Sequence, residues 1–250
     1  MRLDDLVPYL DGFLRVRDVT DDRNALNGLQ VANAGEVRQI AAAVDACQAT
    51  IDAAAERRAD LLLVHHGLFW GGLEPLTGRS YRRAAVLLRH DIAVYSSHLP
   101  LDLHPEVGNN AVLARKLGME VRGWFGEYLG APVGVHGELD LPREELRVLV
   151  AGLLGVSVRL IPGGPERSQR VGVITGAAGS LTRQAAEAGL DTFITGEGQH
   201  WTFHDAQEFG VNVLHAGHYA TEMLGVQALA AHVSERFQLP WSFIDHPTGL

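Results

Sequence analysis

The pattern strand, helix, strand occurs twice in this chain, and it constrains the fold more than any other feature. The first copy runs from the apolar stretch 40–44, through an alanine-rich helical segment, to a second apolar stretch at 61–64. The second copy runs from 171–174, through a Gly/Ser turn and a helix, to 191–195. Apolar strands separated by helices of about ten residues are typical of parallel strands with helical crossovers. We therefore expect an α/β fold with mainly parallel sheets, whose functional residues lie at the carboxyl ends of the strands.

The two copies continue to match downstream, where each is followed by another helix and another strand. The first of these strands leads into His98-x-x-x-Asp102, and the second leads into His218-x-x-x-Glu222. Two such matches at equivalent positions are stronger evidence for related units than a single match would be. We infer two related α/β lobes, residues 1–125 and 126–250, whose strand ends line a shared cleft, and a C-terminal helix that can pack back on the first lobe.

The composition is that of an ordinary globular protein, with 46% hydrophobic and 20% charged residues. The N-terminal segment has acidic residues where a signal peptide would be basic and apolar. The longest apolar run, 148–158, is far shorter than the roughly 20 residues that span a bilayer. We expect a cytoplasmic protein with no membrane partner. Cys47 is the only cysteine, which excludes an intrachain disulfide and a cysteine-based zinc site.

The formal charge of −9 disfavours a general nucleic-acid binder, because such proteins usually present a basic surface. One local exception is the segment 78–90, which contains four arginines. A solvated helix face is the simpler interpretation of this segment, and a basic patch for nucleic acid is the alternative.

Two adjacent histidines, His65 and His66, end an apolar run and are followed by Gly67. They are either the polar end of a core strand or a pair of metal ligands. Neighbouring side chains on a strand point in opposite directions, but at a strand end glycine lets the backbone turn. We expect both rings to enter the cleft and to bind two different ions. His218 and Glu222 are four residues apart and share one face of a helix, so they can bind the same ion or neighbouring ions.

Imidazole and carboxylate are the ligands expected for catalytic divalent zinc, manganese or iron. Asp102 can bridge two ions, and two ions about 3.5–4 Å apart suit hydrolysis. For His98 three roles stay open: a core residue, a group that orients a ligand, and a general acid or base. Glu197 can be a base, a hydrogen-bond partner of a ligand histidine, or a residue that begins a helix.

The glycine-rich segment 172–180 leads into a helix, where backbone amides can bind an anion. It lacks the Lys-Ser/Thr ending of a P-loop and the glycine pattern of a dinucleotide site. A tight turn is therefore the favoured interpretation.

With these motifs in view, the chain resembles the NIF3-like family, also called the GTP cyclohydrolase I type 2 or dinuclear metal centre family, in its short bacterial form. The resemblance runs nearly end to end and is carried by the segments NGLQV (27–31), HHGLFW (65–70), YSSHLPLD (95–102), GNNAVLARKLG (108–118), DTFITGE (191–197) and AGHYATE (216–222). It implies a NIF3-like fold, a homohexameric ring, and two divalent metal ions per chain. It assigns the metal ligands His65, His66, Asp102, His218 and Glu222.

The leading functional hypothesis is a two-metal hydrolase of a nucleotide-like small molecule, and the family name implies GTP cyclohydrolase type 2 activity. We assign His98 and Glu197 as its candidate catalytic residues. The alternative is a non-enzymatic, metal-binding ring that engages a protein or nucleic acid, and a third hypothesis is metal storage. The ligand types do not distinguish among zinc, iron and manganese.

Overall fold

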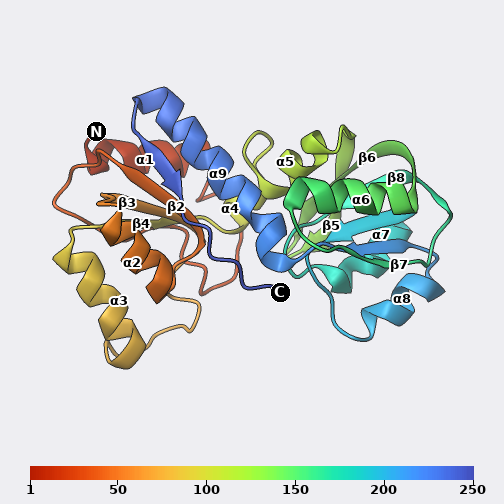
Figure 1. The fold of residues 1–250 in the computed structure, drawn as a ribbon, viewed down its shortest axis with the longest axis horizontal. Coiled ribbons are helices and arrows are strands. Elements are labelled where there is room, and N and C mark those ends of the chain that lie inside the picture. The colour runs from red at the N-terminus through yellow and green to blue at the C-terminus, as the bar shows by residue number, and fades with distance from the viewer. The chain divides into compact units, whose positions relative to one another are not determined.

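The computed structural model describes residues 1–250, which form two compact units. The first unit comprises residues 1–107 and 225–246, and the second comprises residues 108–224 and 247–250. The boundary expected after residue 125 is wrong, because it falls inside a strand of the second unit. That strand pairs with the next one along most of its length, so the two belong to one sheet. Figure 1 shows both units and labels most of their helices and several of their strands.

The first unit contains five strands and four helices of its own, together with part of the last helix. In chain order they are α1 (Leu3–Phe13), β1 (Gly28–Val31), β2 (Ile40–Asp45), α2 (Gln48–Glu56), β3 (Leu61–His66), α3 (Gly78–Arg89), β4 (Ala93–Ser96), α4 (Leu99–Asp102) and β11 (Trp241–Phe243). The last helix, α9 (His218–Phe237), begins in the second unit, and its residues from 225 onward belong to the first.

The sheet of the first unit has the strand order β1-β4-β3-β2-β11. Strands β4, β3, β2 and β11 are parallel, and β1 alone is antiparallel to its neighbour. This arrangement agrees with the expected mainly parallel sheet. The central strands are buried along nearly their whole length, as strands covered by helices on both faces are. Their carboxyl ends, where β3 ends in the two histidines, lie at one edge of the sheet.

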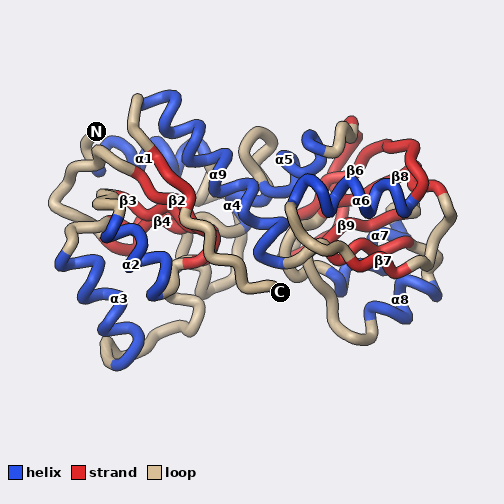
Figure 2. Tube along the Cα trace, viewed as in Figure 1, coloured by secondary structure: helices blue, strands red, loops and turns tan.

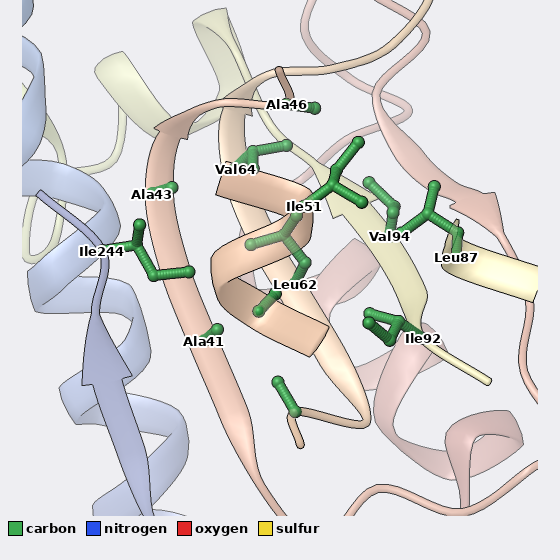
Figure 3. Close-up of a cluster of buried hydrophobic side chains, with 12 residues drawn as sticks. Ala41, Ala43, Ala46, Ile51, Leu62, Val64, Leu87, Ile92, Val94 and Ile244 are labelled. Atoms are coloured by element: carbon green, nitrogen blue, oxygen red, sulfur yellow. The ribbon is translucent and has the colours of Figure 1, made fainter. Parts of the chain in front are cut away.

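One face of this sheet packs against α2 and α3. Ile51 of α2 and Leu87 of α3 are fully buried against Leu62 and Val64 of β3. Figure 3 shows these side chains gathered in one cluster. Cys47 is the residue before α2, where its backbone N–H donates to Oγ1 of Thr50 at 3.0 Å. Cys47 is therefore the N-cap residue of α2.

The second unit contains the remaining elements. They are α5 (Asn109–Lys116), β5 (Glu120–Tyr128), β6 (Ala131–Pro142), α6 (Arg143–Leu154), β7 (Arg159–Ile161), β8 (Arg167–Val173), the 3-10 turn η1 (Gly179–Leu181), α7 (Thr182–Glu187), β9 (Thr192–Thr195), α8 (Thr202–Glu208) and β10 (Asn212–His215). Figure 2 distinguishes the helices, strands and loops of each unit by colour.

The sheet of the second unit has the order β5-β6-β8-β9-β10-β7. Its core repeats the first unit, because β8, β9 and β10 are adjacent and parallel, as β2, β3 and β4 are. The other three pairings are antiparallel, so this sheet is mixed. The long hairpin of β5 and β6 is the main addition. Two related α/β units with parallel strands at their centres are thus confirmed.

No helix of this structure combines the length and the apolar character that crossing a membrane requires.

Candidate metal centre

The two histidines at the end of β3 are held by different acceptors. Nδ1 of His65 donates to the backbone carbonyl of Ser97 at 3.0 Å, and Nδ1 of His66 donates to Oδ1 of Asp45 at 2.9 Å. The sheet register explains the second contact, because Asp45 ends β2 directly beside His66. The two rings lie near each other, with centroids 4.7 Å apart. The turn at Gly67 is crowded, since a Cβ there would collide with the amide of Gln30.

His98 joins this pair from the loop after β4. Its ring centroid lies 5.0 Å from that of His65 and 5.7 Å from that of His66. One ligand nitrogen from each of the three rings lies within 4.8 Å of the others, a spacing that suits a metal ion. Sequence reasoning assigned His98 to the site without fixing its role, and the structure brings it to the histidine pair.

His98 is itself held by a buried carboxylate, that of Asp21. Nδ1 of His98 donates to Oδ1 of Asp21 at 2.8 Å. The other oxygen of Asp21 accepts hydrogen bonds from Nδ2 of Asn27 and from the backbone N–H of Leu99. Burial raises the pKa of Asp21, but the hydrogen bond from His98 and its charge outweigh burial and hold that pKa below its usual value. Asp21 is therefore an anion that fixes the imidazole of His98.

Asn27, the first residue of the NGLQV segment, ties this group together. Its Oδ1 accepts a hydrogen bond from the backbone N–H of His98 at 2.7 Å, while its Nδ2 donates to Asp21 at 2.7 Å. One side chain thus positions both the backbone of His98 and its carboxylate partner.

Asp102 is the last residue of the short helix α4, and it is buried. Its Oδ2 lies 3.6 Å from Nε2 of His65. This pairing differs from the one that the His-x-x-x-Asp spacing suggests, because His98 turns to Asp21. Trp70 covers the same group of rings, with its own ring edge-on to His98 at 4.8 Å and to His66 at 5.6 Å.

The second unit brings His218, Glu222 and Glu197 together. His218 is the first residue of α9, and its Nε2 lies 3.0 Å from Oε2 of Glu222, one turn further along. Its Nδ1 lies 2.7 Å from Oε1 of Glu197, the second residue after β9. Burial lowers the pKa of His218, but hydrogen bonds and attraction from Glu222 and Glu197 outweigh burial and raise the pKa of His218 to about 9. The carboxylate of Glu197 thus contacts the histidine that the sequence predicts as a ligand.

The glycine-rich segment after β8 forms a tight turn, and its amides are engaged inside the protein. The backbone N–H of Gly176 donates to Oγ1 of Thr221, and the N–H of Gly179 donates to the carbonyl of Glu197. The N–H of Ala178 faces Oγ1 of Thr195. These amides are not available to an anion, so the turn is favoured over an anion site.

Gly176 also has a direct steric role at the second group of ligands. Its φ of +70° is a left-handed conformation that glycine adopts without strain. A Cβ at this position would collide with Oε1 of Glu222. Glycine therefore makes the space in which the carboxylate of Glu222 lies.

These donors fit divalent metal ions, and the hydrogen bonds at Nδ1 show why. In His65, His66 and His98, Nδ1 faces an oxygen that only accepts, so it carries the proton. The neutral ring then has its lone pair on Nε2, the form that a metal ion requires. Metal-binding histidines are commonly oriented in this way by a carboxylate or a carbonyl. With Asp102 beside His65, the first unit offers an imidazole and carboxylate donor set typical of zinc, iron or manganese.

Sequence reasoning missed Asp21 and Asp45. Asp45 left a usable signal, because it ends the strand parallel to the one that ends in the histidine pair. Asp21 left none, because it lies in an irregular segment 77 residues before its partner.

Comparison with known proteins agrees with the fold. Residues 1–248 match the family model described as Duf34/NIF3 (NGG1p interacting factor 3). The chain is 45% identical to the GTP cyclohydrolase 1 type 2 homolog of Deinococcus radiodurans, with 99% of this chain and 94% of that protein covered. It is 42% identical to the protein of the same name from Archaeoglobus fulgidus, with both chains fully covered. The crystal structure of TTHA1606 from Thermus thermophilus superimposes with a TM-score of 0.91 at 43% identity, and it too covers both chains completely.

Proposed function

Since the chain belongs to the Duf34/NIF3 family, we propose that it is a metal-dependent hydrolase that holds two divalent ions and acts on a nucleotide-like small molecule. His65, His66, Asp102, His218 and Glu222 are its metal ligands. His65 and His66 bind different ions, and Asp102 can bridge them. The ligand groups of the two units are combined on the ground of the sequence resemblance.

One observation supports the proposal most strongly. The rings of His65, His66 and His98 each have an acceptor at Nδ1, which leaves the lone pair on Nε2 to bind a metal ion in His65 and His66 and to accept a proton in His98. The ligand nitrogens of these three rings also lie within 4.8 Å of one another, a convergence that a hydrogen-bonded core histidine does not require. Relatives named GTP cyclohydrolase 1 type 2 homolog make GTP the first substrate to test.

The chemistry divides between the ions and the protein. The residues assigned as ligands would hold two divalent ions, which would supply polarisation of a substrate oxygen and a lowered pKa of a water molecule. His98 and Glu197 are the candidate groups for proton transfer. Asp21 holds the His98 ring in one orientation, as a general acid or base requires. Glu197 is partly exposed while it contacts His218, so its carboxylate can exchange protons with solvent.

The test is a screen of nucleotides and phosphoesters, GTP first, against protein loaded with zinc, iron or manganese. Metal content is measured on the same samples. We expect two ions per chain and turnover of at least one substrate by the wild type. His66→Ala and Glu222→Ala should abolish that turnover. Full activity in either variant after metal removal would contradict the hydrolase proposal.

The second candidate function is a metal-binding ring that engages a protein or nucleic acid without turnover, and exposed apolar and basic side chains on α3 favour it. Tyr81 and Leu88 are largely exposed there, and so are Arg82 and Arg89. The basic character is reduced, however, because Arg79 pairs with Glu74 at 2.9 Å. A titration with single-stranded nucleic acid tests this function. A binding constant that falls steeply with salt would support it, and absent or salt-insensitive binding would contradict it.

The homohexameric ring is proposed on the family resemblance alone. Light scattering on the purified protein measures the mass of the assembly directly. Six times the 27.1 kDa chain mass is the expected result.

A further inference from the structure

The two adjacent histidines of β3 differ in the charge of the group that holds them. The acceptor at Nδ1 of His65 is a neutral backbone carbonyl, that of Ser97. The acceptor at Nδ1 of His66 is the carboxylate of Asp45. A carboxylate also holds His98, so in this unit His65 is the exception.

The local structure fixes Asp45 in place before any ion binds. The backbone N–H of Ala46 donates to the carbonyl of His66 at 2.8 Å, which continues the pairing of β2 with β3 past Asp45. The carbonyl of Asp45 accepts a hydrogen bond from Oγ1 of Thr50 at 2.6 Å. These bonds hold the backbone on either side of the pair, so Cα of Asp45 stays beside that of His66 and the carboxylate, 34% exposed in its side chain, reaches the imidazole at 2.9 Å.

The charge matters because a bound metal ion draws electron density from the imidazole. A carboxylate at Nδ1 stabilises the resulting positive charge and raises the basicity of Nε2 as a ligand. A carbonyl orients the ring equally well but contributes only a dipole. The two histidines are therefore oriented alike and are unequal in donor strength.

We infer that Asp45 is a positioning residue whose negative charge supports the ion bound by His66, while the ion bound by His65 does not depend on it. This inference rests on the proposed two-ion function. It makes the two ion positions chemically distinct, so that one can be weakened while the other remains. Asp45 acts through His66 and is not itself a ligand.

The decisive variant is Asp45→Asn, which keeps an oxygen acceptor of the same length and removes the charge. The experiment titrates metal-free protein with zinc against a competing chelator and resolves the two binding steps. We expect one step to weaken by about 10–100-fold, the range found when an orienting partner of a metal-binding histidine is changed. The other step should change by less than about threefold.

Three further variants identify the steps and control for the substitution. His66→Ala should remove the step that Asp45→Asn weakens, and His65→Ala should remove the other. Asp52→Asn is the matched control, because Asp52 lies on the neighbouring helix α2, is exposed and contacts only Gln48. It should leave both steps unchanged.

Two results would overturn the inference. Both steps within about threefold of the wild type in Asp45→Asn would show that charge is irrelevant. Loss of the step assigned to His65 would show that the carboxylate supports the other ion.

A measurement on the metal-free protein separates this inference from the proposed function. Long-range proton–nitrogen NMR at pH 8 reports which ring nitrogen carries the proton. In Asp45→Ala, His66 should lose its preference for Nδ1–H while His65 keeps it. An unchanged His66 ring would contradict the inference. A wild type that binds no zinc would contradict the proposed function, and the ring measurement would still decide the role of Asp45.

Discussion

A His-x-x-x-acid motif follows the third of the three adjacent parallel strands in each unit, β4 in the first and β10 in the second, and these two motifs form different structures. In the second unit His218 is the first residue of α9, so it and Glu222 lie on one helical face with their side chains 3.0 Å apart. In the first unit His98 precedes α4 and has φ −92° and ψ −108°, outside the helical region. Its ring turns to Asp21, and Asp102 pairs with His65 instead. Equal spacing gives equal geometry only when the helix begins at the same residue.

The two groups also differ in burial. His65 is fully buried and Asp102 is 10% exposed in its side chain, whereas His218 is 29% and Glu197 44% exposed. The contrast holds for these histidines and for the carboxylates that support His98 and His218, since the side chain of Asp21 is 6% exposed. It does not extend to Glu222, whose side chain is only 4% exposed. Loss of the supporting carboxylate should therefore destabilise the first unit more than the second.

The largest expected effect on stability concerns the central strand of each sheet, β3 in the first unit and β9 in the second. Leu62→Ala in β3 and Phe193→Ala in β9 each empty a fully buried site. Each should lower the free energy of unfolding by about 3–4 kcal/mol. Chemical denaturation followed by circular dichroism measures this, and Leu73→Ala, at a fully exposed position, is the control. A loss below about 1 kcal/mol in one variant would show that its strand does not form a comparable core.

The next effect concerns Gly176, which lies beside the carboxylate of Glu222 in the second unit. Gly176→Ala should lower the free energy of unfolding by about 2–3 kcal/mol, because alanine is strained at this left-handed φ and its Cβ collides with Glu222. Zinc binding should weaken as the carboxylate is displaced. Gly155→Ala is the matched control, because Gly155 has the same φ of +70° with open space around it. It should cost about 1 kcal/mol and leave zinc binding intact. Equal losses of stability and of zinc binding in both variants would contradict the steric role of Gly176.

Asp21 and Glu197 offer a direct comparison of buried and exposed support. The carboxylate of Asp21 accepts hydrogen bonds from four donors in the first unit. In Asp21→Asn the NH2 group would face donors, so the free energy of unfolding should fall by about 2 kcal/mol. Glu197→Gln changes a group that is 44% exposed and should cost less than about 1 kcal/mol. Thermal unfolding of both metal-free variants measures the difference. A larger loss for Glu197→Gln would reverse the contrast between the units.

The smallest effect is a pH dependence in the metal-free protein. The pKa of His218 is about 9, above the ordinary value of 6.5. The charged ring therefore contributes stability that is complete below pH 6.5 and is lost as the pH rises through 9. The melting temperature should fall over this range more in the wild type than in His218→Gln. Parallel pH curves for the two proteins would contradict the raised pKa.

Much of this architecture follows from the sequence. Strand and helix periodicity predicted both parallel cores, because buried strands between amphipathic helices leave a characteristic apolar pattern. The residues HHG, His98 and Glu197 were placed correctly at strand ends. The unit boundary was not predictable, because the hairpin β5–β6 has no parallel repeat to mark it, and its membership depends on long-range pairing.

By itself, the sequence determined which residue types stand at the ends of the parallel strands, since that depends on local pattern and on short spacings. Only the tertiary structure decided which of them meet. In the folded chain Asp21 contacts His98, which lies 77 residues later, Asp102 lies beside His65, and Asp45 lies beside His66. Each of these contacts depends on strand register or on the path of a loop. The few residues around each histidine determine neither the register nor the loop path. Local sequence therefore identifies the donor residues, and long-range packing determines which of them contact one another.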